Sequence, residues 1–273
     1  MGRILCNLHT HSAYCDGANT PEETVIYAIE NGCKCLGFSG HAPSGVDGDY
    51  GFITPENIVA YSNEIKRLKK IYGDKIEIYL GIEQDYFSPD INVEYEYIIG
   101  SVHYVKKNGN FVPMDISYEE LKKGIDEEFS GDAYQMAKTY YETLADTPRV
   151  TGCDIIGHTD LLTKFNEKYR YIDENDTRYR HCALEAVDTL IDQSVIFEIN
   201  TGAMKKGWKT NPYPADFIIK HINERGGRLM LSSDCHAKEN LFSFFDETEK
   251  RLSSLGIREL YVLENGKFVS KSI

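Results

Sequence analysis

A regular alternation of two kinds of segment constrains the fold of this chain more than any other feature. Short apolar runs typical of buried strands are separated by capped, amphipathic runs typical of helices. Such alternation predicts parallel strands joined by right-handed crossovers, in either an open sheet or a closed barrel. No linker or composition shift divides the 273 residues, so we expect one domain over 1–273. The expected strands are 3–8, 36–39, 76–82, 97–101, 154–157, 195–199 and 228–231.

Helix caps and turn residues mark the segments between these strands. Thr20, Pro21 and Glu23 form a capping signature, and Thr54 with Pro55 repeats the start signal. The helices are expected over 20–31, 54–72, 118–144 with a break near Gly131, 177–191, 214–224 and 239–255. A hairpin that turns at Asn265-Gly266 is expected from 259 to the end, and residues 43–53 are expected to form a loop.

Composition excludes several classes of function. The formal net charge of −13 disfavours a nucleic-acid partner, because phosphate backbones require a basic surface. No apolar run approaches the roughly 18 residues that a membrane-spanning helix needs, and the start of the chain lacks the pattern of a signal peptide. Seven scattered cysteines within apolar segments indicate a reduced, cytoplasmic protein rather than a disulfide framework. The sequence is silent on oligomeric state.

Histidines and carboxylates gather just past the ends of the predicted strands. His9 and His11 stand two residues apart, so on an extended backbone both can point to one side and hold a metal ion. Only His181 and His221, which fall within helices, lie outside the pattern and are expected on helix surfaces or in packing. In a barrel all carboxyl ends meet at one mouth, so the pattern predicts a site for several metal ions. The residues concerned are His9, His11, Asp16, His41, Glu83, His103, His158, Asp234 and His236.

These motifs together resemble the polymerase and histidinol phosphatase (PHP) family, over nearly the whole chain and in the same order. Within that family the chain is most similar to the stand-alone histidinol-phosphate phosphatases. The resemblance implies a distorted (β/α)7 barrel in a single domain. The motifs are the H-x-H-x-x-x-x-D start, Ser39-Gly40-His41, Gly81-Ile82-Glu83, Gly100-Ser101-Val102-His103, Gly157-His158 and Ser233-Asp234-Cys235-His236.

The resemblance also implies three divalent metal ions, which imidazole and carboxylate ligands suit as zinc, manganese or iron. By it, His9, His11, Glu83 and Asp234 hold the first ion. Glu83 bridges to a second ion held by His103 and His158, while Asp16, His41 and His236 hold the third. Gly40 departs from the family pattern, which often has an acidic residue there that could orient the following histidine.

A cluster of this kind suits hydrolysis of a phosphate monoester. Closely spaced metals lower the pKa of a bound water and neutralise the phosphoryl oxygens, so we expect in-line attack by a metal-bridging hydroxide without a phosphoenzyme. The resemblance points to L-histidinol phosphate as the small phosphorylated substrate, which would place the chain in histidine biosynthesis. Another small phosphoester, such as a nucleotide, a sugar phosphate or a phosphotyrosyl peptide, is the first alternative. A non-catalytic metal-binding module is the second.

Lysines near the strand ends are the candidates for substrate phosphate binding. Lys164, Lys205 and Lys206 follow the fifth and sixth strands, where the phosphatase branch tends to carry arginine. A lysine keeps the charge but lacks the two-pronged hydrogen bonding of a guanidinium. Asp160 and His236 are candidate proton donors to the leaving group, and the sequence does not choose between them.

Overall fold

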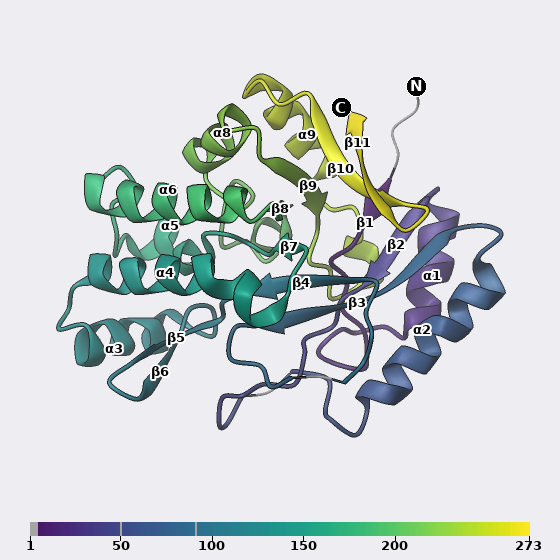
Figure 1. The fold of residues 1–273 in the computed structure, drawn as a ribbon, viewed down its shortest axis with the longest axis horizontal. Coiled ribbons are helices and arrows are strands. Elements are labelled where there is room, and N and C mark those ends of the chain that lie inside the picture. The colour runs from purple at the N-terminus through teal and green to yellow at the C-terminus, as the bar shows by residue number, and fades with distance from the viewer. Residues whose placement is uncertain (1–4, 50, 91) are drawn as a thin grey trace.

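A computed structural model describes residues 5–49, 51–90 and 92–273. Seven parallel strands form one sheet in the order β1-β2-β3-β4-β7-β8-β9, so each strand pairs with the next one along the main sheet (Figure 1). Their bounds are Cys6–Asn7, Cys35–Phe38, Glu77–Asp85, Tyr97–Ser101, Ile155–Ile156, Ile196–Asn200 and Arg228–Ser232. All seven predicted strands are therefore present, although the predicted positions 3 and 4 lie outside the described residues.

The two edges of this sheet meet at the carboxyl end of β1. The amide of His11 donates to the carbonyl of Cys235 at 2.9 Å, and the amide of Cys235 donates to the carbonyl of His9 at 3.2 Å. This contact comes just after β1 and β9 and nearly closes the sheet into a barrel. The barrel alternative, rather than the open sheet, is confirmed.

The barrel interior is apolar at the amino ends of the strands and polar at the carboxyl ends. Tyr97 belongs to the apolar part of the interior, where its hydroxyl donates to the carbonyl of Leu8 and its ring lies against Gly81. Because side chains alternate along a strand, Gly81 and Glu83 of β3 face the same side. The C-terminal hairpin of β10 (Glu259–Glu264) and β11 (Lys267–Ser272) brings Leu263 into the same interior cluster. The predicted hairpin is thus confirmed.

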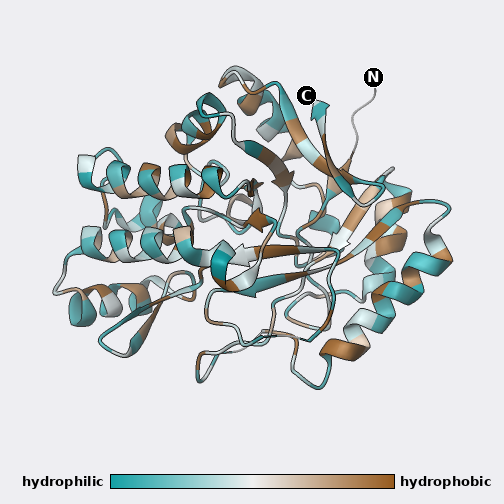
Figure 2. Ribbon diagram, in the orientation of Figure 1, coloured by the Kyte–Doolittle hydropathy of each residue, from teal (hydrophilic) through white to brown (hydrophobic). Residues whose placement is uncertain are grey.

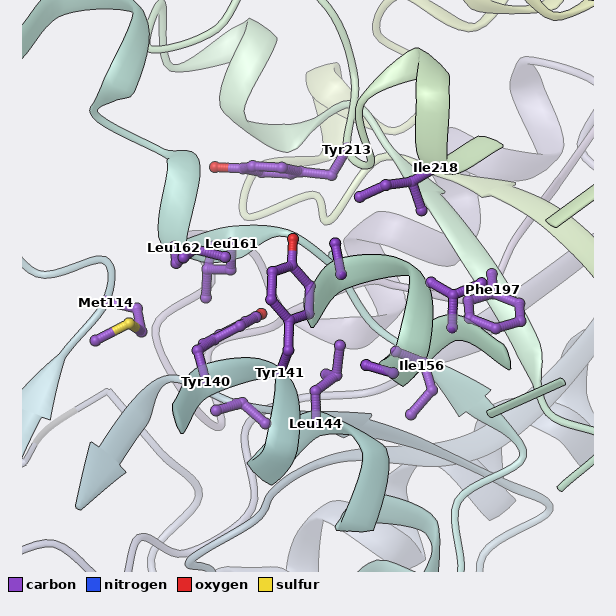
Figure 3. Packing of buried hydrophobic residues seen from close by; sticks show 14 of the residues in the cluster. Met114, Tyr140, Tyr141, Leu144, Ile156, Leu161, Leu162, Phe197, Tyr213 and Ile218 are labelled. Carbon is purple, nitrogen blue, oxygen red and sulfur yellow. The ribbon is translucent and has the colours of Figure 1, made fainter. Parts of the chain in front are cut away.

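Helices surround the sheet and bury its outer face (Figure 1). Hydrophobic residues follow the strands and the helix faces turned towards them (Figure 2). Figure 3 shows one part of this packing, in which Tyr141 and Leu144 lie near Ile156 and Phe197. The longer helices are α1 (Pro21–Glu30), α2 (Ile58–Tyr72), α3 (Tyr118–Glu128), α4 (Ala133–Thr151), α6 (Thr177–Asp192), α8 (Asp216–Glu224) and α9 (Phe245–Ser254). No helix among the described residues is long and apolar enough to cross a membrane.

Several small elements were not predicted. The strands β5 (Tyr104–Lys107) and β6 (Asn110–Pro113) form a hairpin at Asn108-Gly109, where both residues have positive φ. Helix α3 (Tyr118–Glu128) is separated from α4 at Ser130-Gly131, as predicted. Short helical turns lie in the loops that follow β7, β8 and β9: η1 (Leu161–Thr163), α5 (Asn166–Tyr169), α7 (Gly202–Lys205) and η2 (Lys238–Asn240).

Candidate active site

The predicted histidines and carboxylates converge at the mouth formed by the carboxyl ends of the strands. Among the described residues, three groups bring ligand atoms within 4.8 Å of one another. His181 and His221 lie on α6 and α8 instead, where they face Glu185 and Asp188, so their predicted place on helices is confirmed. The three groups are His9, His11 and Asp234; His11, Asp16, His41 and His236; and His41, Glu83 and His103.

The first group lies deepest in the mouth. Nε2 of His11 is 3.1 Å from Oδ1 of Asp234, and Nε2 of His9 is 3.6 Å from the same oxygen. Asp234, which follows β9, has a φ of 49°, and His158, which follows β7, has a φ of 20°. Left-handed backbone in residues other than glycine is costly and concentrates at functional sites. The loops after β7 and β9 therefore hold these two side chains in conformations that the chain would not adopt by itself.

The second group surrounds Asp16, which the loop after β1 supplies. Oδ2 of Asp16 is 3.0 Å from Nε2 of His236 and 3.8 Å from Nε2 of His41, while Oδ1 is 3.3 Å from Nδ1 of His11. The rings of His11 and His236 stack with centroids 4.0 Å apart. Burial tends to raise the pKa of Asp16, but the imidazoles of His11 and His236 lower it well below its usual range. This carboxylate therefore stays charged and ready to bind a cation.

Glu83 stands at the centre of the mouth and is almost fully buried. Its Oε2 lies 2.9 Å from Nδ1 of His41 and 3.3 Å from Nε2 of His9. Its Oε1 lies 2.9 Å from Nε2 of His158 and 3.5 Å from Nε2 of His103. Nε2 of His11 is 3.6 Å from Oε2, so one carboxylate faces five imidazoles, as a carboxylate that bridges two ions would. The geometry also brings His41 to Glu83, a pairing that the resemblance did not include.

Unpaired buried atoms show that this cluster fits metal ions. Nε2 of His9, Nε2 of His11 and Oε2 of Glu83 are buried and make no hydrogen bond with the rest of the described chain. A buried polar atom without a partner is destabilising, and such atoms are rare in folded proteins. Burial would lower the pKa of His9, but Glu198, Asp234 and Glu83 raise it well above its usual value, so the site attracts positive charge. Imidazole nitrogens and carboxylate oxygens pointing at one space are the donor set of a transition-metal site.

Sequence reasoning missed Glu198, the residue that holds His9 in place. Oε1 of Glu198 lies 2.6 Å from Nδ1 of His9 and also accepts from the hydroxyl of Ser232. Its Oε2 accepts from the amide of His158 at 2.8 Å and from the side chain of Asn200 at 3.0 Å. The signal was a carboxylate inside the otherwise apolar β8, because a charge in that position is stable only with several partners.

Cys15 occupies the space next to Gly40. A Cβ atom on Gly40 would lie 2.9 Å from Sγ of Cys15, so a side chain there would displace the sulfur. That sulfur is 3.6 Å from Nδ1 of His11 and 3.4 Å from the carbonyl of Ser12, to which it donates. The departure from the family pattern at Gly40 therefore coincides with a thiol that contacts one of the cluster histidines.

The two candidate proton donors lie in different surroundings. His236 lines the mouth. Asp160 is completely buried, and its Oδ2 accepts from the amide of Ala215 at 2.9 Å while its Oδ1 makes no hydrogen bond. Burial raises the pKa of Asp160 to about 6, with Lys209 acting in the opposite direction. Of the two, His236 lines the mouth cavity and Asp160 does not, so which of them donates a proton stays a prediction.

Two of the three predicted phosphate-binding lysines line a small cavity of about 80 Å³ in the mouth. Lys164 and Lys206 border this cavity together with His103 and His158, whereas Lys205 does not line it; Lys205 and Lys206 are both exposed. Nζ of Lys164 donates to the carbonyl of Asp115 at 2.7 Å and lies 3.2 Å from its carboxylate. Of the predicted pair Lys205 and Lys206, only Lys206 therefore lines the cavity beside the cluster.

A barrel whose mouth collects histidine and carboxylate side chains around one space has the arrangement of a metal-dependent enzyme, and metal-dependent hydrolases are one class built in this way. The comparisons with known proteins narrow this class. The chain belongs to the PHP domain family, whose model matches residues 7–202.

Full-length relatives support this assignment. A protein of Schizosaccharomyces pombe named "Probable histidinol-phosphatase" is 31% identical, and the alignment covers 94% of this chain and 89% of that protein. A relative of the same name from Deinococcus radiodurans is 28% identical, covering 93% and 95% of the two chains. The fold is similar to that of histidinol phosphate phosphatase from Lactococcus lactis, whose crystal structure contains zinc, L-histidinol and phosphate. That comparison has a TM-score of 0.74 at 20% identity and covers 97% and 98% of the chains.

Proposed function

We propose that this protein is a metal-dependent phosphatase that hydrolyses L-histidinol phosphate to L-histidinol and phosphate. One observation carries the reaction type: buried imidazole and carboxylate atoms without partners meet at the mouth of the barrel. The substrate is supported by the relative from S. pombe, which matches almost the whole chain. The fold alone would not identify the substrate, because one barrel supports many reactions.

The metal site is proposed to contain three divalent ions, with zinc, manganese and iron as the candidates. His9, His11 and Asp234 would hold one ion, and Asp16, His41 and His236 another, in agreement with two of the three geometric groups. Glu83 would join the first ion to a third between His103 and His158, both of which face its Oε1. When bound, such ions would supply an activated water and neutralise the charge of the phosphoryl group.

The residues of the chain contribute binding and orientation. Lys206 and Lys164 would hold phosphate oxygens as point charges, because both line the mouth cavity. Glu198 would keep Nδ1 of His9 protonated, so that the opposite nitrogen, Nε2, faces the cluster. Neither candidate proton donor is assigned here, since His236 would be a metal ligand and Asp160 does not line the cavity.

The test is phosphate release by protein that has been stripped with a chelator and then reloaded with zinc, manganese or iron. L-histidinol phosphate, a nucleotide, a sugar phosphate and a phosphotyrosyl peptide form the substrate panel. We expect the highest kcat/KM for L-histidinol phosphate, and activity only in reloaded samples. Equal activity of the stripped protein, or no phosphate release from any ester, would contradict the proposal. A preference for another ester would leave the chemistry in place and change the substrate.

A further inference from the structure

A cavity of about 640 Å³ lies at the first turns of α6 and α8, two helices that pack against each other (Figure 1). Its wall consists of these first turns, the segments that precede them and Arg251 of α9. None of its lining residues borders the mouth cavity or belongs to the metal groups. We call this separate space the α6–α8 cavity.

Basic and acidic side chains line the α6–α8 cavity in equal number, but the acidic ones already have donors. Both oxygens of Asp216 accept from the guanidinium of Arg251, at 2.9 and 2.6 Å. The other three carboxylates accept from a backbone amide or from an asparagine side chain: Glu167 from the amide of Thr210 at 2.9 Å, Glu174 from Asn166 at 2.8 Å, and Asp173 from the amide of Asn175 at 2.9 Å.

Lys209 is the buried cation of this wall, with only 8% of its surface exposed. Its Nζ donates to Oγ1 of Thr163 at 2.8 Å, and no ion pair joins it to a carboxylate within the described chain. The charge of Asp160 acts on Lys209 from outside the cavity, but Oδ2 of Asp160 accepts from the amide of Ala215. An ammonium has three donors, and a buried charge without a close counter-ion is destabilising. Lys209 is therefore suited to an anion bound in the cavity.

Two guanidinium groups and a helix start complete the positive side of the cavity. Neither Arg170 nor Arg180 forms an ion pair with another described residue, and Arg180 lies over the ring of Phe217 at 4.1 Å. Helix α8 begins at Asp216 without a side-chain cap, since its N-cap residue is Ala215. The amides at the start of a helix favour an anion. The groups left without a partner in this cavity are thus donors and positive charges.

We propose that the α6–α8 cavity is a second anion site, which binds a small phosphate-bearing molecule without hydrolysing it. One ammonium and two guanidinium groups match the charge and the several acceptor oxygens of a phosphate dianion. Lys209 would bind it from the buried side, and the half-buried Arg180 and the exposed Arg170 from the side of the solvent. Hydrolysis is not expected, because none of the candidate metal ligands lines this cavity.

The experiment is equilibrium dialysis of zinc-loaded protein against labelled inorganic phosphate, which counts the phosphates bound per chain and their affinities. Lys209→Met removes the buried charge and keeps most of the side-chain volume. Arg180→Gln is the second variant, and it decides alone if Lys209→Met does not fold. The matched control is Arg178→Gln, because Arg178 is exposed on the same turn of α6, pairs with Asp176 and does not line the cavity. Lys206→Ala weakens binding in the mouth and so distinguishes the two sites.

We expect two phosphates per wild-type chain at saturation. Lys209→Met and Arg180→Gln should each weaken one of them about tenfold or more, because hydrogen bonds to charged groups are the stronger class. Arg178→Gln should retain both affinities, and Lys206→Ala should weaken only the other phosphate.

The inference would be overturned by a single phosphate that responds to Lys206→Ala and to neither cavity variant, by equal losses in Arg178→Gln and Arg180→Gln, or by no bound phosphate at all. A single phosphate that responds to the cavity variants and not to Lys206→Ala would support the second site. That last result would count against phosphate binding in the mouth, and hence against the proposed function instead.

Discussion

Replacement of Glu198 offers the most informative perturbation of the site. Glu198 is completely buried and accepts from four donors on four different segments of the chain. In Glu198→Ala, Nδ1 of His9 and the amide of His158 lose their acceptor inside the protein. Each buried donor left without a partner costs about 1–3 kcal/mol, so these two donors alone should cost the metal-free variant about 2–6 kcal/mol of unfolding free energy. His9 would also lose its orientation, and loss of such a partner typically weakens metal binding by about 10–100-fold.

Urea unfolding of chelator-treated protein measures the first effect, and competition with a fluorescent zinc chelator measures the second. Glu198→Gln tests the charge, because it keeps the shape of the side chain and one acceptor oxygen. Ser232→Ala is the matched control, since it removes one hydrogen bond to Glu198 without touching His9. Ser232→Ala should lower stability modestly and leave the zinc affinity near that of wild type. The reasoning would be refuted by a Glu198→Ala variant that binds zinc as tightly as wild type.

Three further predictions concern other parts of the molecule. Lys206→Ala should raise KM for a phosphate ester by about tenfold or more in steady-state assays, whereas Lys205→Ala should not, because of these two exposed lysines only Lys206 lines the cavity. Equal effects of the two substitutions would contradict the assignment. Iodoacetamide should alkylate Cys15 before the other cysteines in peptide mapping, and bound metal should protect Cys15 from alkylation. Burial raises the pKa of the Cys15 thiol, but the neighbouring imidazoles outweigh burial, so the pKa is lowered and the thiol is more reactive. Rapid labelling elsewhere would argue against this. Gly81→Ala should cost about 1–3 kcal/mol in urea unfolding, because the added Cβ would lie 2.2 Å from the Tyr97 ring; an unchanged midpoint would show that the ring moves freely.

The sequence predicts the barrel and the mouth because both follow from simple rules. Parallel strands place their carboxyl ends together, so residues as distant as His9 and His236 could be brought together without coordinates. The hairpin β5–β6 was missed although Asn108-Gly109 is a strong turn signal. Only two residues separate the end of β4 at Ser101 from the start of β5 at Tyr104, so the sequence offers no clear boundary between these two strands.

The finer geometry of the site depends on side-chain positions that no spacing rule contains. The contact of Cys15 with His11, which Gly40 makes room for, depends on how the loop after β1 folds against the one after β2. That Lys206 and not Lys205 lines the mouth cavity depends on the short helix α7. Glu198 could have been found in principle, by asking what would stabilise a charge in a buried strand.

The central claim is that the histidines and carboxylates of the barrel mouth hold several metal ions together. Anomalous diffraction from crystals of zinc-loaded protein, recorded on both sides of the zinc absorption edge, tests it most directly. We predict three adjacent peaks, with His9, His11 and Asp234 around one, Asp16, His41 and His236 around another, and Glu83 between two of them. A mouth without peaks, or zinc bound only at scattered surface residues, would contradict the account.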